Sequence, residues 1–192
     1  LIANTGAVKF AGTNNQNFSG GTFNNGEMMK SSGTVTQTGN TTFSGTLMTL
    51  DAGTLTAVAN NLTVTGATTL GGTATVTSTS GVVTFTGNVT STGSIGSTSG
   101  NIAFSGDYQN NGTLHVGSGT VPSTGHVTST EVLRGTGGRL VFLGNFATTT
   151  GDTFDGGAGY VRLAGGNNQN ITGANFYMVE VQKTAGTATF VD

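Results

Sequence analysis

Apolar and polar residues alternate in a heptapeptide that recurs along the chain. Its four clearest copies are GVVTFTG, GNIAFSG, GTVPSTG and GRLVFLG, which start at positions 81, 100, 119 and 138 and therefore recur with a constant period of 19 (100 − 81). The third and fifth residues are mostly large and apolar, and the residues between them are mostly small or polar. This alternation is typical of a short strand with one buried face. A fixed period of this length predicts a solenoid.

Further copies extend the pattern towards both ends. They start at residues 6, 39, 60 and 159, and the spacing places another start at Gly20, which lacks the motif. If the heptapeptide is counted as positions 1 to 7, two more columns are usually apolar: position 9 (Leu47, Val89, Tyr108, Val127 and Phe146) and position 15 (Ile95, Leu114 and Leu133). Each coil of about 19–21 residues is therefore expected to hold three short strands, and stacked coils would pair them in parallel.

This register makes definite predictions about the core. Four aromatic side chains should point inward: Phe85, Phe104, Phe142 and Phe146. Thr84 and Ala103, which lie between inward positions, should face outward. No 3.6-residue apolar stripe indicates a helix, so the sequence predicts an all-β fold.

A longer repeat overlies the coils. Residues 6–39 align with residues 159–192 without a gap, at an offset of 153 (159 − 6), and 15 of the 34 aligned positions are identical. The shared residues include the block NNQN, the pair Phe23/Phe176, and the charged residues Glu27/Glu180 and Lys30/Lys183. The intervals between coil starts sum to the same 153. We therefore expect residues 1–158 to form one eight-coil unit and residues 159–192 to begin a second copy that continues it.

Composition excludes several classes of function. Only 7% of the residues are charged, the net charge is −2, and there is no cysteine, so thiolate metal sites and disulfides are ruled out. Six Lys and Arg residues do not make the basic patch that nucleic acids require. No apolar run approaches the roughly 20 residues of a transmembrane helix. The N-terminus lacks signal-peptide features, and we expect a mature chain or an excerpt of a longer one.

The coil pattern resembles that of the filamentous-haemagglutinin-type adhesins of bacteria, which implies a right-handed parallel β-helix. The segment NNQNITGANFYMVEVQKTAGTATF is similar to a module of large Gly/Thr/Asn-rich tandem-repeat surface proteins of bacteria. These resemblances imply an extracellular or cell-surface structural protein that forms a fibre or attaches to surfaces. Its partners would be copies of itself, and surface glycans or neighbouring cells are further candidates. The resemblances bring no catalytic, metal-binding or cofactor-binding residues with them.

Two alternatives remain open from the residues themselves. Parallel β-helices can host polysaccharide-cleaving enzymes, and Asp152 with Asp155, or Asp107 with Glu131, could form an acid/base pair. Asp152 and Asp155 also lie in a glycine-rich turn, DTFDGGAGY, but no second coil repeats the aspartates of a calcium site. Solvated corner carboxylates are the simpler interpretation.

The other alternative is an ice-binding face made of stacked Thr-x-Thr rungs. Thr63/Thr65 and Thr84/Thr86 share a coil position, but the next coil carries Ala103/Ser105 there, so this ladder stops after two rungs. The run Thr73, Thr75 and Thr77 adds to the threonine content. Threonine also solvates an outer strand face in many sheets, and that is the simpler interpretation.

The remaining polar candidates are isolated. His115 and His126 occupy different coil positions, which disfavours a shared metal ion. Six Asn-x-Ser/Thr sequons begin at Asn17, Asn40, Asn61, Asn88, Asn111 and Asn170, and glycosylation of any of them is left open. The sequence therefore predicts a non-enzymatic structural protein without a cofactor.

Overall fold

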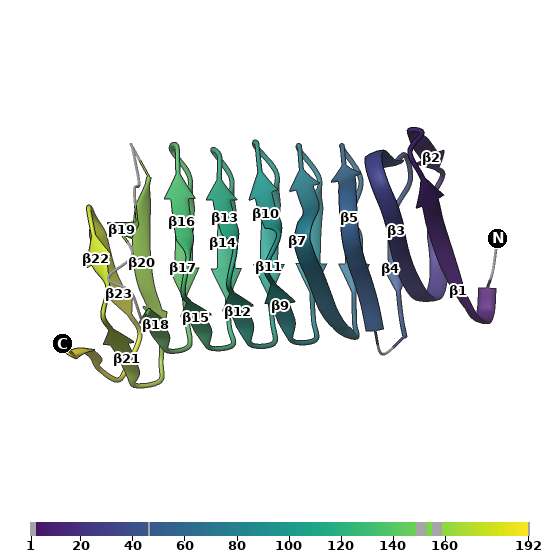
Figure 1. Ribbon diagram of the computed structural model, residues 1–192. Helices are drawn as coiled ribbons and strands as arrows, with labels where there is room; N and C mark the ends of the chain where they lie inside the picture. The colour runs from purple at the N-terminus through teal and green to yellow at the C-terminus, as the bar shows by residue number, and fades with distance from the viewer. Residues whose placement is uncertain (1–2, 46, 149–152, 155–158, 192) are drawn as a thin grey trace.

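The structure is a computed structural model that describes residues 3–45, 47–148, 153–154 and 159–191, and every regular element in these residues is a β-strand. The strands stack into a rod with the two ends of the chain at its opposite ends (Figure 1). Every strand pairing is parallel. The predicted all-β solenoid, a parallel β-helix, is confirmed.

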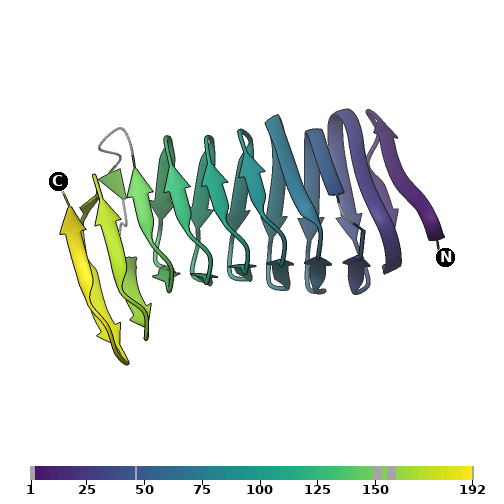
Figure 2. The ribbon, with the colours of Figure 1, turned by 90° about the horizontal axis from the view of Figure 1, so that it is seen from below.

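The rod has three faces, which we number in chain order within a coil. The first face contains the start of β3 (Gly21–Gln37), then β4 (Thr41–Phe43), β6 (Leu62–Val64), β8 (Val82–Phe85), β11 (Asn101–Phe104), β14 (Thr120–Ser123), β17 (Arg139–Phe142), β20 (Tyr160–Gly165) and β23 (Val179–Lys183). Figure 2 shows these successive coils from below.

The other two faces share the long strands β3, β5 (Leu47–Ala57) and β7 (Ala67–Ser78), which turn a corner without a break. The second face adds β1 (Ala3–Gly12), β9 (Val89–Ser91), β12 (Tyr108–Asn110), β15 (Val127–Ser129), β18 (Phe146–Thr148), β21 (Gln169–Thr172) and β24 (Ala188–Val191). The third face adds β2 (Gln16–Phe18), β10 (Ser94–Ser97), β13 (Thr113–Val116), β16 (Val132–Gly135), β19 (Thr153–Phe154) and β22 (Asn175–Phe176).

The core register is as predicted. Val83 lies beside Ile102, one period later in the sequence, and Phe85 lies beside Phe104. The four aromatic residues Phe85, Phe104, Phe142 and Phe146 are buried, whereas Thr84 and Ala103 are half-exposed. Alternation places one side of each strand in a continuous apolar column.

The structure corrects the position of two coil starts and one column residue. The heptapeptide at residue 6 does not join the first face, because Val8 lies beside Gly26 in the second face. A coil start at Gly20 would place Asn24 beside Phe43, but Phe23 lies there, so this coil starts one position earlier than expected. In the second face Met48, not Leu47, lies beside Thr68. The interval between the first two expected starts, at positions 6 and 20, is too short for a full turn, so the first heptapeptide lies in the second face and not in the first.

This correction changes the geometry of the 153-residue offset. Val8 lies in the second face, but its counterpart Val161 lies in the first, beside Leu140. Between them the chain enters the first face eight times, at β3, β4, β6, β8, β11, β14, β17 and β20. The offset therefore spans eight turns less one third, and the two copies of the repeated segment lie on different faces.

Polar side chains replace apolar ones in part of the second-face core. Ser91, Asn110 and Ser129 stack at equivalent inward positions and are buried. The Tyr108 hydroxyl donates to Asn110 Oδ1 at 2.9 Å, and Asn110 Nδ2 donates to Ser129 Oγ at 3.1 Å. Because these groups satisfy one another, the polar column can stay buried. Burial also raises the pKa of Tyr108 above its ordinary value of 10.0, since the charged phenolate would lose its hydration.

We expect Tyr108→Phe to change how stability depends on alkaline pH. The unfolded chain releases the phenolic proton above about pH 10 while the folded chain keeps it, so wild-type stability should fall by about 1.4 kcal/mol per pH unit beyond that point. The variant should lose about 1–3 kcal/mol at pH 8, because Asn110 Oδ1 loses its donor, but should lack this extra slope. Urea unfolding from pH 8 to 11.5 measures both effects. Parallel stability curves for the two proteins would contradict the prediction.

Candidate functional site: the repeated module and the corner ladder

The two copies of the repeated segment fold in the same way. In the N-terminal copy β1 pairs with β3 so that Val8 lies beside Gly26, and in the C-terminal copy β20 pairs with β23 so that Val161 lies beside Val179. We call residues 6–37 and 159–190 the N-terminal and C-terminal modules. Each is a two-layered piece of the stack with its own internal register.

A lysine contacts the NNQN block in the same way in both modules. Lys30 is buried, and its Nζ donates to the Asn14 carbonyl at 2.6 Å and to Gln16 Oε1 at 3.4 Å. Lys183, which is half-exposed at the end of the stack, makes the same contacts: its Nζ donates to the Asn167 carbonyl and to Gln169 Oε1, both at 2.7 Å. Buried charge is tolerated only with such partners. The lysine therefore joins the two layers of each module from within.

An ion pair joins the same two layers from outside. Lys9 Nζ lies 2.7 Å from Glu27 Oε2, and Arg162 Nη2 lies 2.8 Å from Glu180 Oε2. The hydrogen bond with Glu180 raises the pKa of Arg162 further above its ordinary value. Exposed pairs contribute about 1 kcal/mol or less. Their main effect is to place opposite charges at adjacent outward positions, which favours one strand register.

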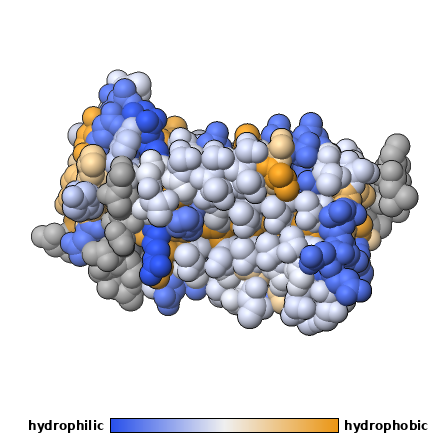
Figure 3. Space-filling model, turned by 90° about the horizontal axis from the view of Figure 1, so that it is seen from above, coloured by the Kyte–Doolittle hydropathy of each residue, from blue (hydrophilic) through white to orange (hydrophobic). Residues whose placement is uncertain are grey.

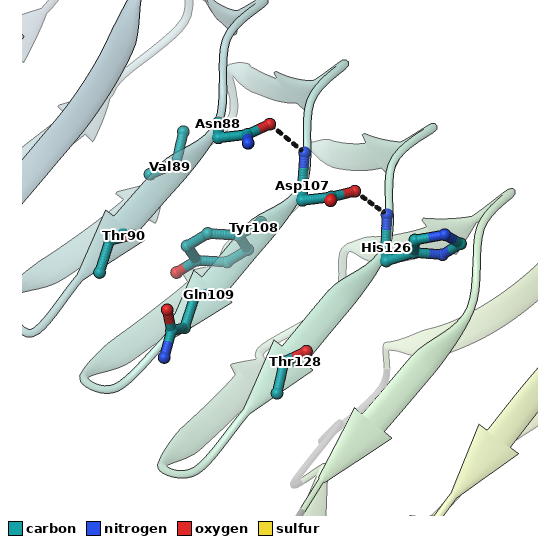
Figure 4. A pocket seen from close by; sticks show the side chains of 8 residues that line it. All are labelled: Asn88, Val89, Thr90, Asp107, Tyr108, Gln109, His126 and Thr128. Atoms are coloured by element: carbon teal, nitrogen blue, oxygen red, sulfur yellow. Dashed lines mark hydrogen bonds between the residues drawn. The ribbon is translucent and has the colours of Figure 1, made fainter. Parts of the chain in front are cut away.

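A second repeating device runs along the corner before the second face. Asn88 Oδ1 accepts a hydrogen bond from the Asp107 backbone N–H (3.0 Å), and Asp107 Oδ1 accepts one from the His126 N–H (2.8 Å; Figure 4). His126 Nδ1 accepts from the Asn145 N–H (3.1 Å), and Asn145 Oδ1 accepts from Asn170. We call this row of five residues the corner ladder. Each of its side-chain acceptors satisfies a backbone donor of the next coil.

We expect His126→Asn to be tolerated and His126→Ala to be destabilising. Asparagine supplies the acceptor that Asn88 and Asn145 supply in neighbouring coils, whereas alanine leaves the Asn145 N–H without its side-chain partner. The loss in alanine should be about 0.5–1.5 kcal/mol. Chemical denaturation of the two variants beside the wild type measures the difference. Equal destabilisation by both substitutions would show that the acceptor has no role.

The corner ladder borders a shallow open depression on the second face. It has a volume of about 390 Å³ and is bounded by Asn88, Asp107 and His126 on one side and by the outward residues Thr90, Gln109 and Thr128. Figure 4 shows these side chains along the outer surface of adjacent coils. The groups offer hydrogen bonds, and Asp107 is the one carboxylate among them. This suits a polar contact surface better than a catalytic cleft.

The structure does not bring Asp107 and Glu131 together as an acid/base pair. Asp107 precedes β12, and Glu131 follows β15 of the next coil, so they lie at opposite ends of the second face. The three residues of β12 and the bend at residues 111–112 separate Asp107 from residue 112, the position that matches Glu131 one coil earlier, and the strand alone spans roughly 10 Å. Glycosidase carboxylates lie no more than about 9.5 Å apart. Asp152 and Asp155 lie outside the described residues.

The histidines and sequons also separate. His115 is an outward residue of β13 on the third face, whereas His126 belongs to the corner ladder. In the described part of the chain no three His, Asp or Glu side chains gather as metal ligands. Asn40, Asn61 and Asn88, three of the sequon residues, accept backbone hydrogen bonds from the following coil. Asn111 accepts one from the Thr130 hydroxyl. Packing between coils therefore accounts for these four asparagines.

The third face carries a threonine ladder that the period of the sequence does not reveal. Three Thr-x-Thr rungs are adjacent in the stack: Thr34/Thr36, Thr54/Thr56 and Thr75/Thr77. The next rung is Ser94/Gly96, so one of the two rows ends there. All six threonines are half-exposed. Their spacing in the sequence varies because these coils differ in length, which hides the ladder from a fixed-period count.

The side of the rod that is seen from above is mostly intermediate in hydropathy (Figure 3). Viewed from above, most of the rod is pale in hydropathy, and hydrophilic groups gather towards its two ends (Figure 3). None of the described residues belongs to a helix that could cross a membrane. Comparisons with protein-family models, with curated proteins and with solved structures found no match.

Proposed function

We propose that this protein is a non-enzymatic structural component of an extracellular bacterial fibre or surface adhesin, built from stacked solenoid repeats. The observation that carries the proposal is the recurrence of one module, with the same internal hydrogen bonds and ion pair, at both ends of a continuous stack. A unit that recurs along one axis adds length without changing its cross-section. Such growth suits a fibre, whereas an enzyme needs one cleft in which reactive groups converge.

The chemistry of the surface supports the same proposal. Charged residues are sparse, and many polar side chains at the corners are engaged in holding the next coil. Repetition along a rod would offer many weak polar contacts to a glycan or to a neighbouring fibre, and many weak contacts on one axis can add up to strong attachment.

Electron microscopy of purified native material tests the proposal. We expect thin unbranched rods whose length far exceeds the roughly 48 Å of ten stacked strands. Compact particles of uniform size, together with activity on polysaccharides, would overturn the fibre and favour the carbohydrate-active alternative.

Ice binding is a second candidate, favoured by the threonine ladder of the third face. Its hydroxyl rows repeat about every 4.8 Å along the axis. Thermal hysteresis of the purified chain, measured beside a Thr56→Lys variant, decides it. Hysteresis that the variant loses would support ice binding, and its absence in the wild-type chain would exclude this function for the ladder.

A further inference from the structure

The same module is covered at one end of the rod and uncovered at the other. In the N-terminal module, β5 covers β3, and Met28 and Gln37 are buried. Their counterparts in the C-terminal module are Val181 and Phe190 (28 + 153, 37 + 153), which are 58% and 56% exposed. Large apolar side chains at inward positions of a strand are normally covered. The second layer of the C-terminal module is therefore suited to receive another layer.

Two free edges result among the described strands. We call the free side of β23 and β24 the C-terminal edge, and the free side of β1 and β2 the N-terminal edge; they lie at opposite ends of the rod (Figure 2). Val8, Phe10 and Phe18 of the N-terminal edge are only partly buried. Unpaired strand edges with apolar side chains are templates for pairing with another chain.

We propose that the C-terminal edge binds the N-terminal edge of a second copy of this chain. This inference rests on the proposed assembly into a fibre and names the surfaces that would form it. Each contact would place a C-terminal module directly against an N-terminal module, so that the two-layered modules follow one another in an unbroken stack.

The interior of the chain supplies the register of this contact. In the C-terminal module β20 pairs with β23 and β21 pairs with β24. The N-terminal edge has the same form as β20 and β21, because β1 and β2 are their counterparts. Placing β1 and β2 of the second copy on β23 and β24 puts Val8 beside Val179, Phe10 beside Val181, and Phe18 beside Phe190. Each pair is apolar, and each covers a side chain that is exposed or partly exposed in one copy.

The charges favour the same register. Glu180 lies on the C-terminal edge with Arg162 beside it one layer inside, and Lys9 lies on the N-terminal edge with Glu27 beside it one layer inside; all four point outward. The contact would bring Lys9 of the second copy beside Glu180 and make one row of alternating sign. A slip by one residue would turn Phe10 outward and Lys9 inward. Apolar burial thus supplies the affinity, and the ion pairs select the register.

Because the two edges differ, the contact is heterologous, and copies added along one axis do not close into a ring. An assembly of any length keeps one free C-terminal edge and one free N-terminal edge. The predicted product is therefore an open linear assembly whose length increases with protein concentration.

Sedimentation velocity of the 192-residue chain over a range of concentrations tests the contact. We expect the wild type to form species of increasing size, and Phe190→Asp to weaken association about tenfold or more, since a charge replaces a buried ring. Val58→Asp is the matched control, because Val58 is a 40% exposed valine at a turn of the third face in the body of the rod, away from both edges. It should associate as the wild type does.

Complementation makes the test specific. Phe10→Asp should block the N-terminal edge, and a mixture of Phe10→Asp with Phe190→Asp chains retains one good edge of each kind, so it should form 1:1 dimers and nothing longer. Circular dichroism verifies the folding of each variant. If Phe10→Asp disturbs the first coil, Lys9→Glu, which places like charges beside Glu180, replaces it with a several-fold weakening expected.

The results of these experiments distinguish a failure of the proposed edge contact from a failure of the proposed fibre. Association that persists unchanged in Phe190→Asp would overturn the edge contact and leave a fibre assembled through another surface. A wild-type chain that stays monomeric at every concentration would also overturn the contact, and microscopy of native material would then decide the fibre alone.

Discussion

Replacing Phe104 by alanine should lower the free energy of unfolding by about 3–5 kcal/mol, as large-to-small changes in well-packed cores do. Phe104 lies in the middle of the rod, stacked between Phe85 (ring centroids 5.5 Å apart) and Tyr108 (4.2 Å). Its neighbours belong to strands paired on both sides, so they have little freedom to close the cavity. Denaturant unfolding followed by circular dichroism measures the loss.

The matched control is Phe190→Ala in the same protein at low concentration. Phe190 is 56% exposed at the end of the stack, so its truncation leaves no enclosed cavity and should cost less than about 1 kcal/mol. Similar losses for the two substitutions would mean that the interior coils are not packed as described.

A methyl group at a corner should be almost as damaging as a cavity. Gly119→Ala should destabilise by about 1–3 kcal/mol, because its Cβ would overlap the backbone carbonyl of Gly100 in the preceding coil. Adjacent coils approach so closely at this corner that no side chain fits between them. The backbone of Gly100 cannot move aside without lengthening the ladder hydrogen bonds on either side.

Gly96→Ala provides the contrast, since the nearest atom to its added Cβ would be the His115 carbonyl oxygen at 3.6 Å, an ordinary contact. The substitution also reduces the freedom of the unfolded chain, so we expect no loss or a gain of about 0.4–1 kcal/mol. Thermal melting curves of the two variants and the wild type measure this difference in stability. A tolerated Gly119→Ala would show that the coils can separate at this corner.

The alternation of side chains makes the core predictable. A strand with one buried face leaves a period of two, and the recurrence of that pattern once per coil places Phe85, Phe104 and Phe142 in one column on the sequence alone. The same logic cannot choose a face for the heptapeptide at residue 6, because an alternating strand satisfies any of the three faces equally well. In the sequence, only the short interval between this heptapeptide and the next coil start, near residue 20, indicates that it does not lie in the first face.

The hydrogen-bonding roles of polar side chains are harder to predict from the sequence. Asn88, Asp107, His126 and Asn145 recur once per coil, and that spacing is visible in the sequence. Their shared role is not, because side-chain acceptors bonded to the backbone of the next coil leave no hydropathy signal. For Asn110 the sequence is misleading, because an amide side chain is typical of an exposed position. The structure shows that it is buried in a core column, where Tyr108 and Ser129 satisfy its hydrogen bonds.

The placement of the two modules on different faces has a consequence for any longer stack made from the 153-residue unit. Each unit would be rotated about the rod axis by one third of a revolution relative to the unit before it. The original orientation would return after three units, or roughly 110 Å along the axis. A surface feature that occurs once per unit would then point in three directions along the rod. A partner that binds this feature could then bind the rod from any of three directions through the same contacts.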